Sequence, residues 1–410
     1  MQTNVQIDSK NLRGCDDNFR SRGHHITIEA HVLVKNCELL NRILTEMNYL
    51  DYNKSNKSLL IDFVDGKKYK CLKKIKSGGF GEVFLAINNE TDEPVAIKIE
   101  NGESRHLMLE NEFNLYSKLS GGVGFPNILY FGKEKTYNVL VMDLLGPSLE
   151  ELFNFCERKF SLKTILMIGV QLIDRIKFVH SKNYIHQDIK SDNILIGRDD
   201  KSTLIYLVDF GLCHQYRNPK TGKHIQCNLR DNFCGTWSFA SINALRSRTQ
   251  SRRDDLEALG YLLIYFHRGN LPWDSLSGET DSQKFEKIAE IKISTNVEDL
   301  CSGLPDDFMM YMLYCRSLKF ENDPDYDFLK KLFKRTFMSY DFKMDLLFDW
   351  TPDKKHLSIC EVNKYSCKHN APKGRNGKAI KDINDGAKKR KIDETKKTDD
   401  ENKAKKKRKK

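Results

Sequence analysis

The sequence has no run of about 18 apolar residues, the length that a membrane-spanning helix requires. The first ten residues are polar and contain no apolar stretch of the kind found in a secretory signal. The 11 cysteines are scattered, and none belongs to a close Cys-x-x-Cys pair. In a chain of 410 residues, this scatter favours free thiols in a reducing compartment over a disulfide framework. We therefore expect a protein that has no membrane partner.

Charge is plentiful, but its excess lies at one end of the chain. The formal net charge is +11, and residues 368–410 hold 18 Lys and Arg against 7 Asp and Glu. The 367 residues before them therefore contain equal numbers of basic and acidic side chains. Aromatic residues are absent after Tyr365. A segment so charged and so poor in apolar side chains is expected to be disordered from residue 368.

The spacing of apolar residues changes once along the chain. Four strands are predicted at 69–75, 81–87, 94–100 and 138–142, with a helix near 105–119. After Gly146 the apolar spacing becomes helical, and Ser161 is the expected N-cap of a helix that ends near 181–183. A short strand at 204–208 and a buried helix at 254–267 follow. These patterns predict an α+β fold, in which a small antiparallel sheet precedes a large, mainly helical part.

Four polar side chains suited to phosphoryl transfer lie within residues 186–209. Asp188 could orient and deprotonate an attacking hydroxyl, and Lys190 could neutralise charge on a moving phosphoryl group. Asn193 and Asp209 are hard oxygen donors suited to Mg²⁺. An aspartate in a loop is most often a turn residue. The pattern His-x-Asp-x-Lys-x-x-Asn, followed by a strand that ends in Asp-Phe-Gly, rarely arises by chance and therefore predicts a catalytic site.

A glycine-rich segment lies between the first two predicted strands. Glycines allow the backbone to approach phosphate oxygens closely, although glycines in a hairpin are more often ordinary turn residues. The segment consists of Ile75, Lys76, Ser77, Gly78, Gly79, Phe80, Gly81, Glu82 and Val83.

Lys98 stands on a strand whose neighbouring residues are apolar. A buried lysine needs a carboxylate partner. Glu112 on the predicted helix is the candidate, and Glu110 is the competing one. The pair would hold Lys98 against the α- and β-phosphates of a nucleotide. The alternative is a surface lysine beside a solvated helix.

Beyond these motifs, further segments resemble protein kinases of the casein kinase 1 family. The resemblance extends from about residue 69 to residue 350, and the diagnostic segments are 144–150, 153–156, 216–225, 240–243 and 251–257. It implies a bilobal Ser/Thr protein kinase that uses ATP and Mg²⁺. It also implies protein substrates that have acidic or phosphorylated residues near the acceptor hydroxyl. The same matching implies that Met142 is the gatekeeper, that Asp143 to Leu145 form the adenine hinge, and that Asp255 braces the catalytic loop. The implied ATP site contains residues 75–83 together with Ala96, Lys98, Glu112, Met142, Asp143 and Leu145.

The resemblance divides the chain into a kinase domain at 66–350 and two extensions. The small lobe is expected at about 66–143 and the large lobe at about 146–350. Residues 1–65 are either a small accessory element or a loosely ordered extension. The basic clusters within 351–410 favour binding to a nuclear import receptor, and nonspecific contact with nucleic acid is the alternative. We expect a monomer located in the nucleus and the cytoplasm.

Three positions depart from the family pattern, and a fourth, which belongs to the substrate anion site, retains it. Lys76 replaces the first glycine of the glycine-rich segment, and Gln187 replaces an arginine that receives an activation-loop phosphate in most kinases. We therefore expect activity without activation-loop phosphorylation. Ser238 replaces a basic residue of the family's substrate anion site, whereas Lys284 retains another. A weaker dependence on a phosphorylated substrate is expected. Lys76 and Gln187 also support an alternative, a pseudokinase scaffold that binds partners without phosphoryl transfer.

Overall fold

The computed structural model describes residues 61–79, 81–103, 107–230, 233–276 and 280–351. Expectations for residues 1–60, for Phe80 and for the basic tail lie outside these ranges. Within them, no helix is both long enough and apolar enough to cross a membrane. The seven cysteines in this part of the chain form no disulfide bonds with one another.

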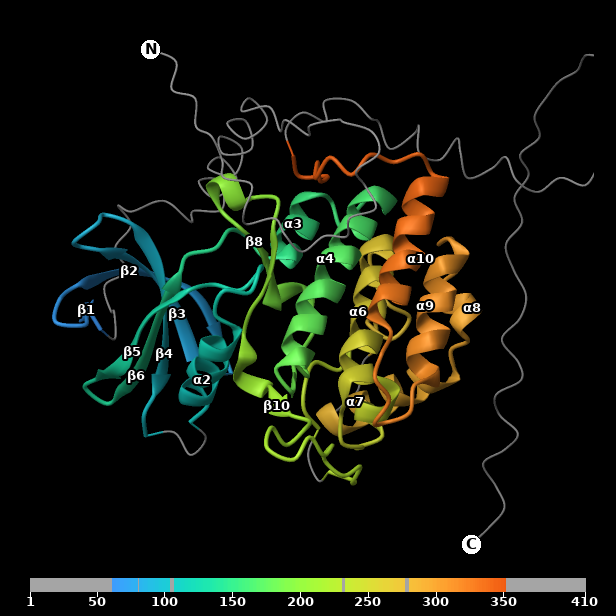
Figure 1. Ribbon diagram of the computed structural model, residues 1–410, viewed down its shortest axis with the longest axis horizontal. Coiled ribbons are helices and arrows are strands. Elements are labelled where there is room, and N and C mark those ends of the chain that lie inside the picture. The colour runs from blue at the N-terminus through green and yellow to red at the C-terminus, as the bar shows by residue number, and fades with distance from the viewer. Residues whose placement is uncertain (1–60, 80, 104–106, 231–232, 277–279, 352–410) are drawn as a thin grey trace, which may run out of the picture. The chain divides into compact units, whose positions relative to one another are not determined.

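A six-stranded antiparallel sheet forms the first lobe, in the order β1-β2-β3-β4-β6-β5 (Figure 1). The strands are β1 (Phe63–Val64), β2 (Tyr69–Gly78), β3 (Gly81–Asn88), β4 (Pro94–Asn101), β5 (Ile128–Glu134) and β6 (Tyr137–Asp143). The four strands predicted from the sequence correspond to β2, β3, β4 and β6. The sheet also contains β1 and β5, which were not predicted. Gly132 and Lys133, a pair of residues typical of a turn, instead pair with Val139 and Asn138 within the sheet.

The register of β4 decides which side chains face the second lobe. Ala96 pairs with Met142, and Lys98 pairs with Val83. Directly paired residues point to the same side of a sheet, and so do residues two apart on one strand. Ala96 and Met142 belong to the core that also includes the large lobe. The alternate residues of β4 face a second, smaller core, so Lys98 points toward the large lobe.

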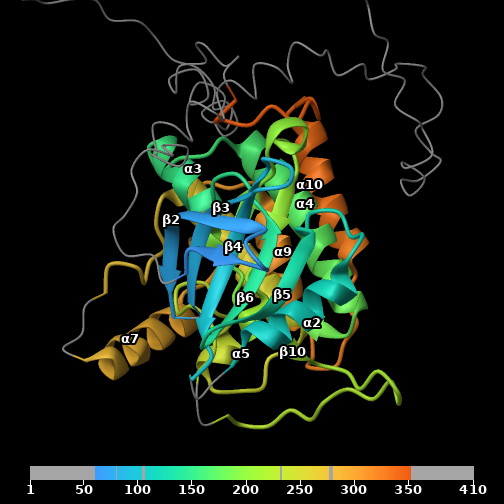
Figure 2. The same cartoon turned by 90° about the vertical axis from the view of Figure 1, so that its left-hand side faces the viewer.

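Helix α2 (Leu109–Leu119) packs against β5 and β6 (Figure 2). It begins four residues later than expected, because Glu100 of β4 receives its first hydrogen bonds. Oε1 of Glu100 accepts the backbone N–H of Met108 at 2.6 Å and that of Leu109 at 3.1 Å. These N–H groups have no partner inside the helix. The buried Glu100 therefore joins the start of α2 directly to the sheet.

The second lobe is mainly helical, which confirms the predicted α+β fold. Its helices are α3 (Leu149–Phe155), α4 (Leu162–Ser181), α5 (Ile242–Leu245), α6 (Arg252–Arg268), α7 (Asp281–Ser294), α8 (Val297–Leu300), α9 (Asp306–Ser317) and α10 (Tyr326–Ser339). Helix α4 packs against α6 and α10, and α6 also packs against α9 (Figure 1). Ser161 is the N-cap of α4, as expected, and accepts the N–H of Thr164.

Short elements carry the polar residues between α4 and α5. Strand β7 (Tyr184–Ile185) pairs with β10 (His214–Gln215), and β8 (Ile194–Ile196) pairs with β9 (Ile205–Leu207). Single 3₁₀ turns occur at η3 (Ser191–Asn193), η4 (Asp199–Lys201) and η5 (Phe210–Leu212).

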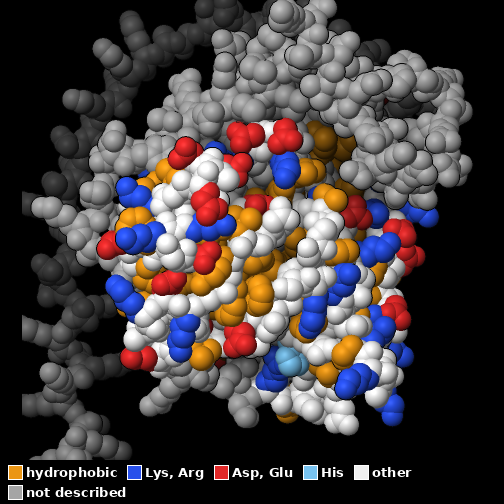
Figure 3. Space-filling model, turned by 60° about the vertical axis from the view of Figure 1, so that its left-hand side comes forward, with side chains coloured by type: hydrophobic (Ala, Val, Ile, Leu, Met, Phe, Trp, Pro, Cys, Tyr) orange, Lys and Arg blue, Asp and Glu red, His pale blue; other side chains and the backbone are white. Residues whose placement is uncertain are grey.

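On the face shown in Figure 3, hydrophobic side chains gather near the centre, with basic and acidic side chains around them.

Candidate active site

Asp255 of α6 holds the loop before the proposed base. One carboxylate oxygen accepts the backbone N–H of His186 at 2.7 Å and a ring N–H of His180 at 2.8 Å, and the other accepts the N–H of Gln187 at 2.8 Å. Burial by itself would raise the pKa of Asp255, but the contacts with His180 and His186 together outweigh it and lower the pKa. Gln187 has a φ of 69°, a conformation that the surrounding hydrogen bonds must hold. This arrangement matches the bracing role expected for Asp255.

Asp188 is 4% exposed and lies at the centre of a cluster of polar side chains. Oδ2 lies 2.7 Å from Nζ of Lys190 and accepts a 3.2 Å hydrogen bond from Nδ2 of Asn193. Oδ1 accepts a 2.7 Å hydrogen bond from the hydroxyl of Thr236, which also accepts one from Lys190 at 3.3 Å. The structure thus brings Asp188, Lys190 and Asn193 together.

Thr236 is the member of this cluster that the sequence did not suggest. It lies 48 residues after Asp188, outside the segments that resemble the casein kinase 1 family. Its position five residues before Ser241 was the one available signal, because Ser241 belongs to a diagnostic segment. A threonine without an obvious partner is too common to be singled out.

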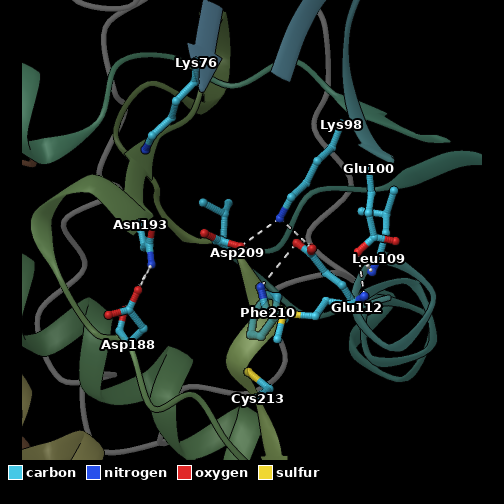
Figure 4. A network of polar contacts seen from close by, with 12 residues as sticks. Lys76, Lys98, Glu100, Leu109, Glu112, Asp188, Asn193, Asp209, Phe210 and Cys213 are labelled. Atoms are coloured by element: carbon cyan, nitrogen blue, oxygen red, sulfur yellow. Dashed lines mark hydrogen bonds and ion pairs between the residues drawn. The ribbon is translucent and has the colours of Figure 1, made fainter. Parts of the chain in front are cut away.

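Lys98 forms two ion pairs at once (Figure 4). Its Nζ lies 2.6 Å from Oε2 of Glu112 and 2.8 Å from Oδ1 of Asp209. Glu112 is 1% exposed, whereas Glu110 is exposed, so the structure selects Glu112 as the partner. Burial alone would lower the pKa of Lys98, but the two carboxylates outweigh it and raise the pKa above its usual value. Burial alone would raise the pKa of Asp209, but Lys98, together with His186 and Lys190, outweighs it and lowers the pKa.

Phe210 connects α2 to the catalytic loop. Its ring packs edge-on against Tyr116, with ring centroids 4.9 Å apart, and lies 5.1 Å from the ring of His186. Its backbone N–H donates to Oε1 of Glu112 at 3.3 Å, and the N–H of Asp209 donates to the hydroxyl of Tyr116 at 3.3 Å. The helix that carries Glu112, the Asp-Phe-Gly segment and the catalytic loop therefore form one continuous contact network.

Asn193 and Asp209 each have an oxygen suited to a cation. Nδ2 of Asn193 donates to Asp188, and Oδ1 of Asp209 contacts Lys98. Among the described residues, none donates a hydrogen bond to Oδ1 of Asn193 or to Oδ2 of Asp209. Mg²⁺ prefers such hard oxygens and usually takes its remaining ligands from phosphates and water. The donor set therefore fits Mg²⁺ bound together with a nucleotide.

The glycine-rich hairpin reaches the catalytic loop through Lys76. Nζ of Lys76 donates to the backbone carbonyl of Asp192 at 3.0 Å. Strand β2 continues to Gly78, three residues beyond its expected end, and β3 begins at Gly81. Gly81 has a φ of 124°, and a Cβ there would lie 2.3 Å from the carbonyl oxygen of Ile99. Only glycine fits this position.

The expected hinge, Asp143 to Leu145, begins at the end of β6, the last strand of the first lobe. Met142 and Asp143 end β6, and Met142 is buried opposite Ala96. Oδ2 of Asp143 accepts the backbone N–H of Asn127 at 2.9 Å and its side-chain amide at 2.8 Å. Leu145 is buried just beyond the strand. These contacts place the expected hinge residues at the connection between the two lobes.

A cavity of about 300 Å³ contains both residues that were considered for substrate anion binding. It is lined by Gly235, Thr236, Trp237, Ser238, Trp273, Asp274, Lys284 and Ile288. Because Thr236 contacts Asp188, the cavity lies beside the proposed base. Lys284 contributes positive charge to it, and Asp274 contributes negative charge.

Residues 69–338 match the family model described as a protein kinase domain. The match covers more than half of the 410 residues and extends from β2 to α10. It includes Lys98, Glu112, Asp188, Asn193 and Asp209, the polar residues of the geometry described above.

Proposed function

Because the chain belongs to the protein kinase family, we propose that it is an active Ser/Thr protein kinase of the casein kinase 1 type. It transfers the γ-phosphoryl group of Mg-ATP to serine or threonine hydroxyls of protein substrates. The observation that carries this proposal is the position of Lys98, which contacts Glu112 and Asp209 simultaneously. A phosphate-binding lysine and a metal-binding aspartate are then in place together, as phosphoryl transfer by kinases requires.

The residues around Asp188 have separate roles in this proposal. Asp188 orients the acceptor hydroxyl and takes its proton, and Lys190 neutralises charge on the moving phosphoryl group. Lys98 orients the α- and β-phosphates. Asn193 and Asp209 would hold the Mg²⁺ of bound Mg-ATP, which would neutralise negative charge on the phosphates. Rate acceleration comes from positioning and electrostatics, since no covalent intermediate with the protein is needed.

Specificity for Ser/Thr is supported by the immediate surroundings of the base. Lys190 and Thr236 both contact the Asp188 carboxylate. The family resemblance associates a lysine two residues after the base with Ser/Thr acceptors.

We further propose that activity does not require a phosphate on the activation loop. Gln187 cannot form the paired charge-assisted hydrogen bonds that an arginine would offer to such a phosphate. Its side chain is buried, and its Nε2 has no hydrogen-bond partner among the described residues. The contacts of Phe210 with Tyr116 and His186 are nevertheless formed, which supports a catalytic arrangement that is assembled without such a phosphate.

The basic tail supports a further proposal, import into the nucleus. Its clusters of lysine and arginine lie within 388–391 and 403–410. Deleting residues 386–410 from a fluorescent fusion should reduce nuclear accumulation. Unchanged accumulation would contradict this proposal without affecting the proposed catalysis.

The decisive test of the catalytic proposal is transfer of radiolabelled phosphate from ATP to casein. We expect transfer by the wild-type protein and its loss in Asp188→Asn and in Asp209→Ala. Transfer that persists in both variants would show that the label comes from a contaminant or that the site is elsewhere. Nucleotide binding without any transfer by the wild-type protein would favour the pseudokinase scaffold, which the departures at Lys76 and Gln187 support.

A further inference from the structure

Lys292 of α7 has no exposed surface, and its ammonium lies against the chain that follows Thr236. Its Nζ donates to the carbonyl of Trp237 at 2.9 Å and to those of Ser238 and Ala240 at 2.8 Å each. An ammonium has three N–H donors. All three therefore donate to backbone carbonyls within residues 237–240.

Two aromatic residues complete the surroundings of this ammonium. Nζ lies 4.6 Å from the ring centroid of Tyr261 and 4.5 Å from that of Trp273, within the range of cation–π attraction. The indole N–H of Trp273 also donates to the carbonyl of Ser238 at 2.8 Å. Lys292 on α7 and Trp273 in the turn after α6 thus hold the same carbonyl.

Burial makes a charged side chain unfavourable at this position. It lowers the pKa of Lys292 well below that of an ordinary lysine. The carboxylates of Glu257 and Asp274 favour the charged form, whereas Arg316 opposes it. An apolar residue would fill the same volume without this desolvation cost. The presence of a lysine at this buried position therefore needs an explanation beyond packing.

The backbone held by Lys292 is the wall of the cavity beside the base. Trp237 and Ser238, whose carbonyls it binds, line the 300 Å³ cavity together with Thr236. The Thr236 hydroxyl is hydrogen bonded to Asp188. A peptide that delivers a hydroxyl to Asp188 must pass close to this wall. The conformation of the wall therefore affects how the acceptor hydroxyl approaches Asp188.

We propose that Lys292 is a positioning residue for the protein acceptor. It fixes the backbone from Trp237 to Ala240, and this keeps Thr236 and the cavity wall aligned with Asp188. The inference rests on the proposed kinase function and assigns Lys292 to acceptor binding alone. Among the described residues, the hydrogen bonds of its ammonium are all to this backbone and its cation–π contacts are with the two rings, and none of them involves Lys98 or Asp209.

The test compares Lys292→Met with Lys287→Met, which removes a lysine charge at an exposed position of the same helix. KM and kcat for a serine peptide and the dissociation constant of Mg-ADP are measured for both variants. In Lys292→Met, KM for the peptide should rise at least about tenfold, because three hydrogen bonds from a charged donor are lost. The Mg-ADP dissociation constant should stay within about twofold, because distant sites act independently. Lys287→Met should resemble the wild-type protein.

A second variant keeps the inference testable if Lys292→Met does not fold. Trp273→Phe retains an aromatic ring but removes the N–H that binds the Ser238 carbonyl, so it should raise KM for the peptide to a smaller extent. An unchanged peptide KM in the folded variants, or an equal weakening of peptide and Mg-ADP binding, would overturn the inference. A wild-type protein that binds Mg-ADP but transfers no phosphate would instead refute the proposed function.

Discussion

The hydroxyl of Thr236 donates a 2.7 Å hydrogen bond to Oδ1 of Asp188, although 48 residues separate the two in the sequence. Lys190 contacts the other oxygen of the same carboxylate at 2.7 Å and also donates to the Thr236 hydroxyl. Thr236 and Lys190 together hold the carboxylate in one orientation. A base must be oriented in this way before it can act on a bound hydroxyl.

Replacing Thr236 with alanine should lower kcat for a peptide by about ten- to a hundredfold, since a poorly oriented catalytic group costs rates of this size. Thr236→Ser keeps the hydroxyl and should retain most of the activity. Steady-state kinetics at saturating ATP would measure both variants. Equal losses in the two would show that the methyl group, rather than the hydrogen bond, matters.

Replacing Lys98 with methionine should reduce phosphate transfer by about a hundred- to a thousandfold, the usual loss when one charge-stabilising group is removed. It also leaves the buried Glu112 without its cation, which should lower the midpoint of thermal unfolding. Lys74→Met is the matched control, because Lys74 pairs with Glu82 at the surface of the same sheet. Loss of activity in both variants alike would argue against a specific role for Lys98.

Treatment with a broad protein phosphatase should leave the activity of the purified protein unchanged. Gln187 offers no cationic partner to an activation-loop phosphate, and the contact of Phe210 with Tyr116 is already formed. Activity is measured before and after treatment, with mass spectrometry to confirm that phosphate was removed. A dephosphorylated protein that is inactive would contradict the expectation.

Replacing Ser238 with arginine should increase the preference for peptides that carry a phosphoserine before the acceptor. The new guanidinium would join Lys284 in the cavity, and one charge-assisted hydrogen bond corresponds to roughly a tenfold gain in kcat/KM. The wild-type protein should show a weaker preference than a typical casein kinase 1. The measurement is the ratio of kcat/KM for primed and unprimed versions of one peptide. A ratio that does not change in Ser238→Arg would exclude Ser238 as a determinant of priming.

Asp254 should make the stability of the protein depend on pH. Burial raises its pKa to about 6 despite hydrogen bonds from Ser241 and Ser251. Between the unfolded value near 3.8 and about 6, the folded protein holds a proton that the unfolded chain has lost. The stabilising contribution is therefore present below about pH 4 and is lost as the pH rises through 6.

Asp254→Asn removes this titration. Urea unfolding at pH 4 and pH 7 should show the variant gaining about 2 kcal/mol relative to the wild-type protein as the pH rises, since one pKa unit corresponds to about 1.4 kcal/mol and the unfolded carboxyl is already partly ionised at pH 4. The other titrating groups are common to both proteins and cancel in the comparison. A stability difference that stays constant with pH would refute the raised pKa.

Local patterns in the sequence were sufficient for much of the fold. Alternating apolar residues located β2, β3, β4 and β6, and Ser161 was recognised as an N-cap, because these signals depend on residues a few positions apart. The short strand β1 and the strand β5 were missed. In β5, Gly132 and Lys133 resemble turn residues, and only pairing with β6 makes them part of a strand.

The sequence by itself determined the chemistry of the site, because Asp188, Lys190, Asn193 and Asp209 stand in a spacing that carries its own signal. Tertiary structure alone decided which distant side chains complete the site. It selected Glu112 over Glu110, because Glu112 lies on the buried face of α2 and contacts Lys98, whereas Glu110 is exposed. It also brought Thr236 to Asp188 and Lys292 to the adjoining backbone. Such contacts join residues about 50 positions apart, and their geometry follows from how helices and strands pack rather than from any local pattern.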